Sequence, residues 1–206
     1  FLSGSDAINS GSLSDAIFTI SGESGHALGS GFAQDIDMNG DGIDDIAGRY
    51  TSNLNGNVWL LYGDDYSGDI PIEYVDARYN VSVEAPNMMR SFPNGGDLDG
   101  DGFDDIVYCD GTADVTYENA LGAVWVLWGS SFEHGNTSPE DFGNVDASGV
   151  QTGAADLILT GDRMHHSGEG CGVGPDWDGD GDAELWVFYP GDAGDFTGFY
   201  LVPGSV

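Results

Sequence analysis

The chain has 206 residues, of which 40% are hydrophobic and 12% aromatic. It contains 36 acidic side chains and only four Lys or Arg, which gives a formal net charge of −32. This length and apolar content predict a folded protein with a buried core, rather than a disordered acidic tail. The charge repels phosphate backbones and anionic lipids, which excludes nucleic-acid binding and disfavours membrane surfaces. No apolar run approaches the roughly 18 to 20 residues of a membrane span.

The chain opens with a turn-rich segment, residues 1–11, which we interpret as the remnant of a preceding repeat followed by a linker. A short strand is predicted at 16–20, where β-branched and aromatic residues gather. A glycine-rich stretch then leads into the acidic segment 37–45.

That acidic segment, DMNGDGIDD, occurs again as DLDGDGFDD at 97–105 and as DWDGDGDAE at 176–184. Each copy has oxygen-bearing side chains at positions 1, 3, 5 and 9, and a glycine after position 5 that permits a tight coil. Ca²⁺ takes about six to eight oxygen ligands and tolerates irregular geometry. Position 7 would add its backbone carbonyl, so three calcium ions are expected. The predicted ligands are Asp37, Asn39, Asp41, Ile43 and Asp45; Asp97, Asp99, Asp101, Phe103 and Asp105; and Asp176, Asp178, Asp180, Asp182 and Glu184.

An EF-hand is excluded, although its loop begins in the same way. That motif needs a bidentate Glu at position 12 and a helix on each side. Position 12 is Gly48, Tyr108 and Val187 in the three copies, and a short apolar, β-rich run follows each loop. A solvated acidic turn would explain one copy but not three with the same ligand pattern. The acidic neighbours Asp44 and Asp104 are expected to be solvated.

The remaining predicted elements repeat the same order along the chain. Strands are expected at 79–83 and 157–160, which we interpret as opening the second and third units. The strands after the loops and the closing strands are expected at 46–47 and 57–63, at 106–109 and 123–129, and at 185–189 and 198–204. No window shows helical periodicity. A repeated order of strand, metal hairpin, strand, polar loop and closing strand predicts an all-β fold of propeller blades, because one blade cannot bury its faces alone.

The loops, together with the aligned closing strands NVWLLYG, AVWVLWG and GFYLVPG, resemble FG-GAP repeats over residues 12–206. These repeats form the blades of integrin alpha-subunit β-propellers, and the units are placed at 12–65, 66–130 and 131–206. The resemblance implies four-stranded blades with Ca²⁺ in the hairpin between the first two strands. Glu184 stands where the family has Asp, and the phenylalanine–glycine signature before the loops is degraded. Family propellers close with about seven blades, so three units imply a partial propeller or a segment of a larger one.

Other side chains give weaker signals. Cys109 and Cys171 fit one disulfide in an oxidising compartment, and two buried free thiols remain an equal alternative. His165 and His166 are adjacent, so on a strand they would point to opposite faces rather than form a pair. No nucleophile elbow or zinc-protease motif occurs, so no catalytic residue is predicted. Core positions are expected for Trp59, Trp125 and Trp186, and exposed binding positions for Trp128 and Trp177.

The sequence therefore predicts an extracellular or cell-surface module, stabilised by calcium, that recognises a protein or glycan without catalysis. The alternative is a structural subunit of an extracellular filament, sheath or surface assembly, in which blades of further copies, or of the rest of a propeller, associate. A third reading is the non-catalytic part of a secreted hydrolase. The metal is expected to be structural, because all ligands of one site lie within nine residues and pin one hairpin.

Overall fold

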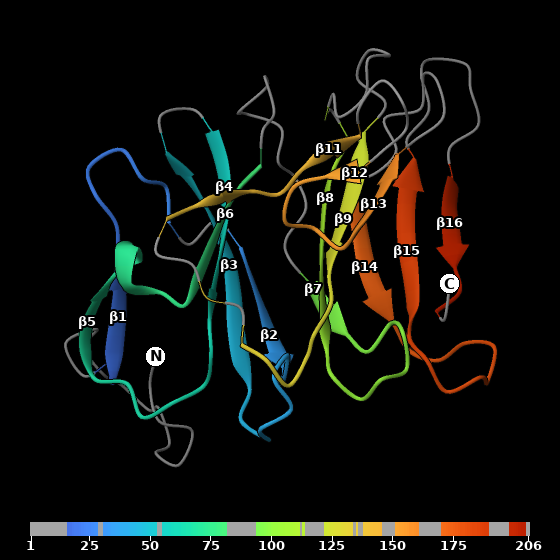
Figure 1. Cartoon of the computed structure of the whole chain (residues 1–206), viewed down its shortest axis with the longest axis horizontal. Helices are drawn as coiled ribbons and strands as arrows, with labels where there is room; N and C mark the ends of the chain where they lie inside the picture. Colours follow the sequence, from blue (N-terminus) through green and yellow to red (C-terminus); the bar gives the residue numbers. More distant parts are fainter. Residues whose placement is uncertain are drawn as a thin grey trace, which may run out of the picture.

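The computed structural model describes residues 16–28, 31–52, 55–81, 94–111, 113, 122–133, 135, 138–145, 151–160, 170–189 and 198–204. Within these ranges the protein is built from 16 strands and one 3-10 turn, which confirms the predicted all-β class (Figure 1). The described strands do not form a closed propeller. In the same ranges, no helix has the length and apolar character needed to cross a bilayer.

Three sheets, antiparallel apart from one short parallel edge strand, follow one another along the chain (Figure 1). Sheet 1 contains, from its inner to its outer edge, β2 (Phe32–Ile36), β3 (Asp45–Ser52), β4 (Asn55–Leu61) and β6 (Ala77–Val81), with the two-residue β10 (Glu140–Asp141) beyond β6. Sheet 2 contains β7 (Asn94–Gly96), β8 (Asp105–Asp110), β9 (Ala123–Leu127) and β13 (Leu157–Thr160). Sheet 3 contains β14 (Gly170–Gly174), β15 (Glu184–Tyr189) and β16 (Gly198–Val202).

Two smaller strand pairs complete the fold. The first is parallel and joins β1 (Phe18–Ser21) to β5 (Gly68–Pro71), and the 3-10 turn η2 (Ile72–Tyr74) follows β5 directly. The second joins β11 (Asn144–Val145) to β12 (Gln151–Thr152). Phe18, Ile20 and Ile70 of the first pair pack against the face of sheet 1 that points away from sheet 2.

The structure corrects the position of two predicted strands. We expected the strands at 79–83 and 157–160 to open the second and third units, but β6 pairs with β4 in sheet 1 and β13 pairs with β9 in sheet 2. The closing strands β4 and β9 are buried, so the backbone groups on their outer edges need hydrogen-bonded partners, which β6 and β13 supply from beyond the predicted unit boundaries. The sheets therefore begin one strand later than the predicted units.

The strands that precede the loops, β2, β7 and β14, were not predicted. Glycines in β7 and β14 remove the alternating apolar pattern on which strand prediction depends, yet close packing requires them. A Cβ on Gly95 of β7 would overlap the Ile36 side chain of β2, so the glycine lets sheet 2 approach sheet 1.

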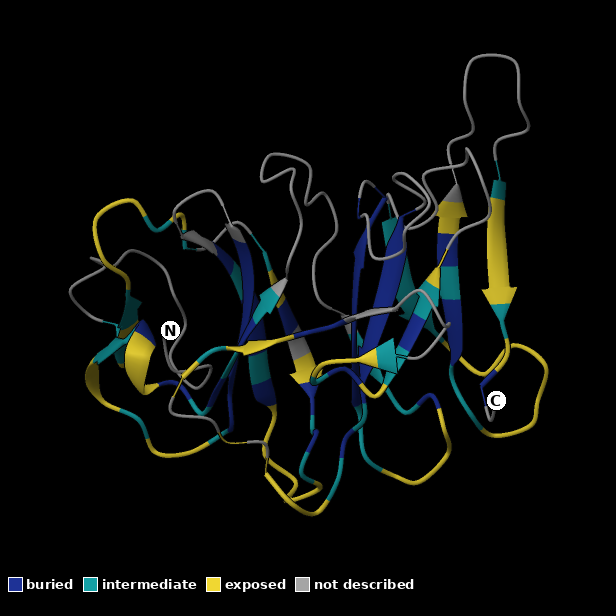
Figure 2. Ribbon diagram, turned by 45° about the horizontal axis from the view of Figure 1, so that its top comes forward, coloured by how far each residue is buried: buried dark blue, intermediate teal, exposed yellow. Residues whose placement is uncertain are grey.

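The core lies between successive sheets. Trp125 of β9 is fully buried between sheets 1 and 2, packs against Phe142, and donates its indole N–H to the Gly143 carbonyl over 3.0 Å. Trp59 of β4 is buried on the opposite side of sheet 1, beneath β5 and η2. Core positions are thus confirmed for both. Trp186 of β15 is only half-buried, because among the described residues nothing stacks on the outer face of sheet 3 (Figure 2).

Cys109 of β8 and Cys171 of β14 form a disulfide, with their Cα atoms 6.1 Å apart. Of the two alternatives that the sequence leaves open, the structure has the bonded one. Cys109 is fully buried in the apolar cluster between sheets 2 and 3. The bond therefore links the third sheet to the second inside their shared core.

Candidate metal centre

Each acidic segment is the hairpin between the first two strands of its sheet, and the three hairpins lie at the same end of the molecule (Figure 1). We call them loop 1 (37–45), loop 2 (97–105) and loop 3 (176–184). The glycines at positions 4 and 6 have positive φ in every loop, for example 70° at Gly40 and 85° at Gly42. Side chains with a Cβ rarely adopt this conformation, so the repeated glycines set the coil of the loop.

The first aspartate of each loop holds the coil together. In loop 1, Asp37 accepts the backbone N–H groups of Asp41 (3.1 Å) and Gly42 (2.9 Å) on its two carboxylate oxygens. Asp97 accepts the same pair of groups in loop 2, and Asp176 accepts two N–H groups in loop 3. These bonds fix the position of the first aspartate against the backbone of its own loop.

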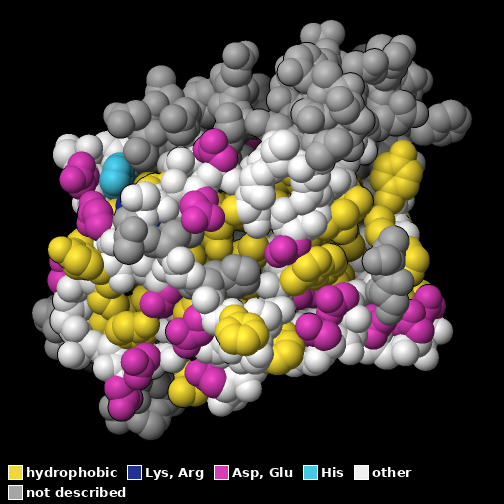
Figure 3. All heavy atoms as spheres, viewed as in Figure 1, with side chains coloured by type: hydrophobic (Ala, Val, Ile, Leu, Met, Phe, Trp, Pro, Cys, Tyr) yellow, Lys and Arg dark blue, Asp and Glu magenta, His cyan; other side chains and the backbone are white. Residues whose placement is uncertain are grey.

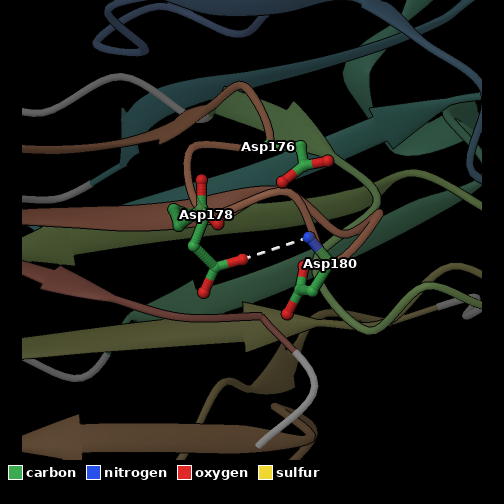
Figure 4. A group of neighbouring side chains, drawn as sticks. Asp176, Asp178 and Asp180 are labelled. Carbon is green, nitrogen blue, oxygen red and sulfur yellow. Dashed lines mark hydrogen bonds between the residues drawn. The ribbon is translucent and has the colours of Figure 1, made fainter.

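Carboxylates of loops 2 and 3 converge closely enough to hold a metal ion. In loop 3, Asp176, Asp178, Asp180 and Glu184 each place one carboxylate oxygen within 4.8 Å of the others. Figure 4 shows the three aspartates around the turn, with the Asp180 N–H donating to Asp178 over 3.2 Å.

Loop 2 brings Asp97, Asp99 and Asp105 together to the same distance, without Asp101. Loop 1 has Asn39 at position 3, and its three carboxylates do not converge to that distance. An ion there would depend on the Asn39 amide oxygen. The carbonyl ligands predicted at position 7 stay predictions.

The acidic residue at position 9 is buried and joins the hairpin to the sheet through hydrogen bonds. Asp105 is fully buried, and accepts the Leu98 N–H over 2.7 Å and the Gly129 N–H over 2.8 Å. Asp45 binds the equivalent Met38 and Gly63 groups in loop 1. The carboxylate thus ties the start of its loop to the glycine that follows the closing strand.

Loop 3 departs from this arrangement because its position 9 is Glu184. One carboxylate oxygen accepts the Trp177 N–H, whereas Oε1 is buried and has no hydrogen-bond partner in the described part of the chain. A buried carboxylate oxygen without a donor costs free energy, which a cation would offset.

Burial also raises the pKa of the position-9 carboxyl groups in loops 1 and 2. Removal from water, with a smaller contribution from the neighbouring loop carboxylates, raises the pKa of Asp105 to about 7 and that of Asp45 to about 6. The backbone N–H donors oppose this shift without cancelling it. The folded, metal-free loops therefore hold protons near neutral pH that a bound cation would displace.

These raised pKa values predict that the stability of the metal-free protein falls as pH rises, the opposite of what carboxylates with lowered pKa values give. The folded state binds more protons than the unfolded state between pH 4 and 7, so its stability is expected to fall as pH rises through this range. In excess calcium the dependence should reverse, because the ligands must be ionised. Melting temperatures of metal-stripped protein at pH 5.0, 6.0 and 7.5 test this, and Asp105→Asn should show a shallower slope. A metal-free melting temperature that climbs from pH 5.0 to 7.5 would contradict the expectation.

Direct hydrogen bonds join the loops in series. The Asp104 N–H donates to the Asp37 carbonyl over 3.1 Å, and the Asp104 carboxylate accepts the Asp37 N–H over 2.8 Å. The Ala183 N–H donates to the Asp97 carbonyl over 2.8 Å, so loop 3 binds loop 2 in the same way. The expectation that Asp104 is solvated was wrong. Its role depends on a residue 67 positions away, which local sequence does not indicate.

We predict that Asp104→Ala lowers the free energy of unfolding by about 1 kcal/mol, since it removes the acceptor of a partly buried N–H. Asp44→Ala is the matched control, because Asp44 is the exposed residue at the same position of loop 1 and should change stability by less than about 0.5 kcal/mol. Urea unfolding in calcium measures both. Equal effects of the two substitutions would show that the inter-loop bond contributes nothing.

The other candidates separate by position. Trp177, in loop 3, has 63% of its surface exposed and meets Trp186 edge-on with ring centroids 5.4 Å apart. Trp128 is half-buried beside the core between sheets 2 and 3. His165 and His166 lie outside the described residues.

Comparison of the chain with protein-family models and with curated proteins finds no match.

Proposed function

We propose that the chain is an extracellular module of FG-GAP-type propeller units, stabilised by Ca²⁺, that recognises a protein or glycan and has no catalytic activity. The observation that carries the proposal is the convergence of carboxylates in loops 2 and 3, within hairpins that repeat along a row of sheets. All the candidate ligands are oxygen atoms on a flexible loop, a donor set that favours Ca²⁺ over zinc or copper. The disulfide and the acidic surface suit an oxidising, cation-rich exterior.

In this proposal the metal fixes the surface instead of contacting the ligand. Calcium neutralises carboxylates that otherwise repel one another, and hydrogen bonds link adjacent loops, so ions in loops 2 and 3 stiffen the whole end of the molecule that carries them. Loops on a rigid scaffold are where recognition usually resides.

Calorimetric titration of metal-stripped protein tests the proposal. We expect at least two bound calcium ions, with magnesium binding more weakly because it demands a stricter octahedral shell. Asp176→Asn should remove one ion and Asp97→Asn another, whereas Asp65→Asn, at an exposed carboxylate outside the loops, should leave the stoichiometry unchanged. Absence of binding at millimolar calcium would remove the basis of the proposal.

A second candidate function is assembly of copies through the outer face of sheet 3. Phe188 and Phe199 have 50% and 51% of their surface exposed on this face, with ring centroids 6.1 Å apart, and Leu201 beside them is 39% exposed. At the positions equivalent to Phe199 and Leu201, the next sheet buries Val58 and Leu60 of sheet 1 and Val124 and Val126 of sheet 2. Figure 3 shows hydrophobic side chains exposed at this end of the molecule. Light scattering across a concentration series in calcium separates a monomeric recognition module from an assembling subunit.

A further inference from the structure

Sheet 3 ends one strand earlier than its neighbours among the described residues. The closing strands β4 and β9 pair on their outer edges with β6 and β13, whereas no described strand pairs with β16 on that edge (Figure 1). An open strand edge presents backbone groups that can pair with another extended chain. Within the part of the chain that the structure describes, one position of the repeated pattern is therefore unfilled.

An apolar cavity of about 100 Å³ lies between sheets 2 and 3 beside this edge. Leu157 and Leu159 of β13 line it from sheet 2, and Leu185 and Val202 line it from sheet 3. Its wall is almost entirely apolar, so it favours hydrocarbon side chains over polar ligands.

The corresponding space between sheets 1 and 2 is filled. Phe142, Ala155 and Ile158 occupy it, with exposures of 0%, 4% and 8%, and all three belong to the segment that leads into and forms β13. Since β13 is the fourth strand of sheet 2, the cavity beside β16 lies where a fourth strand of sheet 3 would place the same kind of side chain.

We propose that the β16 edge and this cavity form a binding site for an extended peptide strand, which adds antiparallel to β16 and places an aliphatic or aromatic side chain in the cavity. Strand addition of this kind takes affinity from backbone hydrogen bonds and specificity from pockets for alternate side chains. The site uses no loop carboxylate as a ligand, so this proposal goes beyond the proposed calcium role. A test can therefore refute the peptide site and leave the calcium sites standing.

The residue that follows β16 differs from its counterparts in sheets 1 and 2, and this difference indicates the chemistry of the peptide. Asp76 accepts the Tyr62 N–H and Asp156 accepts the Trp128 N–H, which joins each fourth strand to its closing strand. The aligned residue after β16 is Pro203, which has no N–H to donate. The strand bound there needs no acidic residue at this position, and the net charge of −32 favours a neutral or basic one.

The probe is a capped, fluorescent peptide with the sequence of residues 154–161, carrying Lys in place of Asp156. We expect saturable binding in fluorescence anisotropy, together with slowed hydrogen exchange at the backbone amides of residues 198–202. The same peptide with Ile158→Asp should bind at least tenfold more weakly, because the charge would enter the apolar cavity. Absence of binding at millimolar peptide, or binding without protection at 198–202, would overturn the proposal.

Two protein variants locate the site. Leu159→Asp, in the cavity wall, should abolish peptide binding, whereas Phe188→Asp, in β15 on the opposite face of sheet 3, should leave it unchanged. If Leu159→Asp does not fold, Leu159→Ala replaces it and should weaken binding at least threefold with a normal melting curve. Calcium stoichiometry should stay constant throughout, which separates failure here from failure of the metal sites. Concentration-dependent self-association that Leu159→Asp abolishes would assign the site to a second copy and refute the peptide ligand.

Discussion

In excess chelator the protein is expected to melt about 10 to 20 °C below its melting temperature in millimolar calcium. Each site stabilises the fold by about 2.7 kcal/mol when the calcium concentration is about 100 times its dissociation constant. For a chain of this size, the melting temperature changes by about 2 to 4 °C per kcal/mol. Two sites, in loops 2 and 3, have converging carboxylates. Without the ion, the loops retain their backbone hydrogen bonds but also the repulsion of several carboxylates within 4.8 Å.

The effect should be specific to calcium and to the loops. Readdition of calcium should restore the melting temperature, whereas the same ionic strength of sodium chloride should restore only the part that comes from general screening. Asp176→Asn should remove about half of the calcium-dependent shift, and Asp65→Asn none of it. If chelator and calcium give the same melting curve, the loops are not metal sites and the proposed function loses its foundation.

Loss of the Cys109–Cys171 disulfide should be the second large effect. The bond closes a loop of 62 residues, for which the reduction in unfolded-state entropy predicts about 4 kcal/mol of stabilisation and a melting temperature about 10 °C higher. The double substitution Cys109→Ala with Cys171→Ala should show this loss. Since the bond links sheet 3 to sheet 2, hydrogen exchange should accelerate most in β14, β15 and β16.

Reduction of the native protein tests the same bond without changing the sequence. A phosphine reductant should lower the melting temperature of the native protein and leave that of the double variant unchanged. If the native protein loses less than about 2 °C under complete reduction, confirmed by thiol counting, the bond does not stabilise the fold as the entropy argument requires.

The sequence by itself determined the all-β class, most of the long strands and the acidic loops, because these depend on local patterns. Alternating apolar residues, glycine at fixed positions and carboxylates two residues apart act over a few residues, whatever the rest of the chain does. It also indicated core positions for Trp59 and Trp125, which are buried.

Only the tertiary structure decided which strand belongs to which sheet, which of two cysteine states occurs, and what the acidic residues beside the ligands do. β6, which contains the start of the strand predicted at 79–83, pairs with the preceding β4, Cys109 bonds to Cys171, and Asp104 binds loop 1. Each of these contacts joins residues far apart in the chain. The disulfide and the Asp104 bond form only when successive sheets stack, since stacking buries the apolar faces and brings the loops within hydrogen-bonding distance. The pairing of β6 depends on which strand edge is open in the folded sheet, and no local pattern encodes either choice.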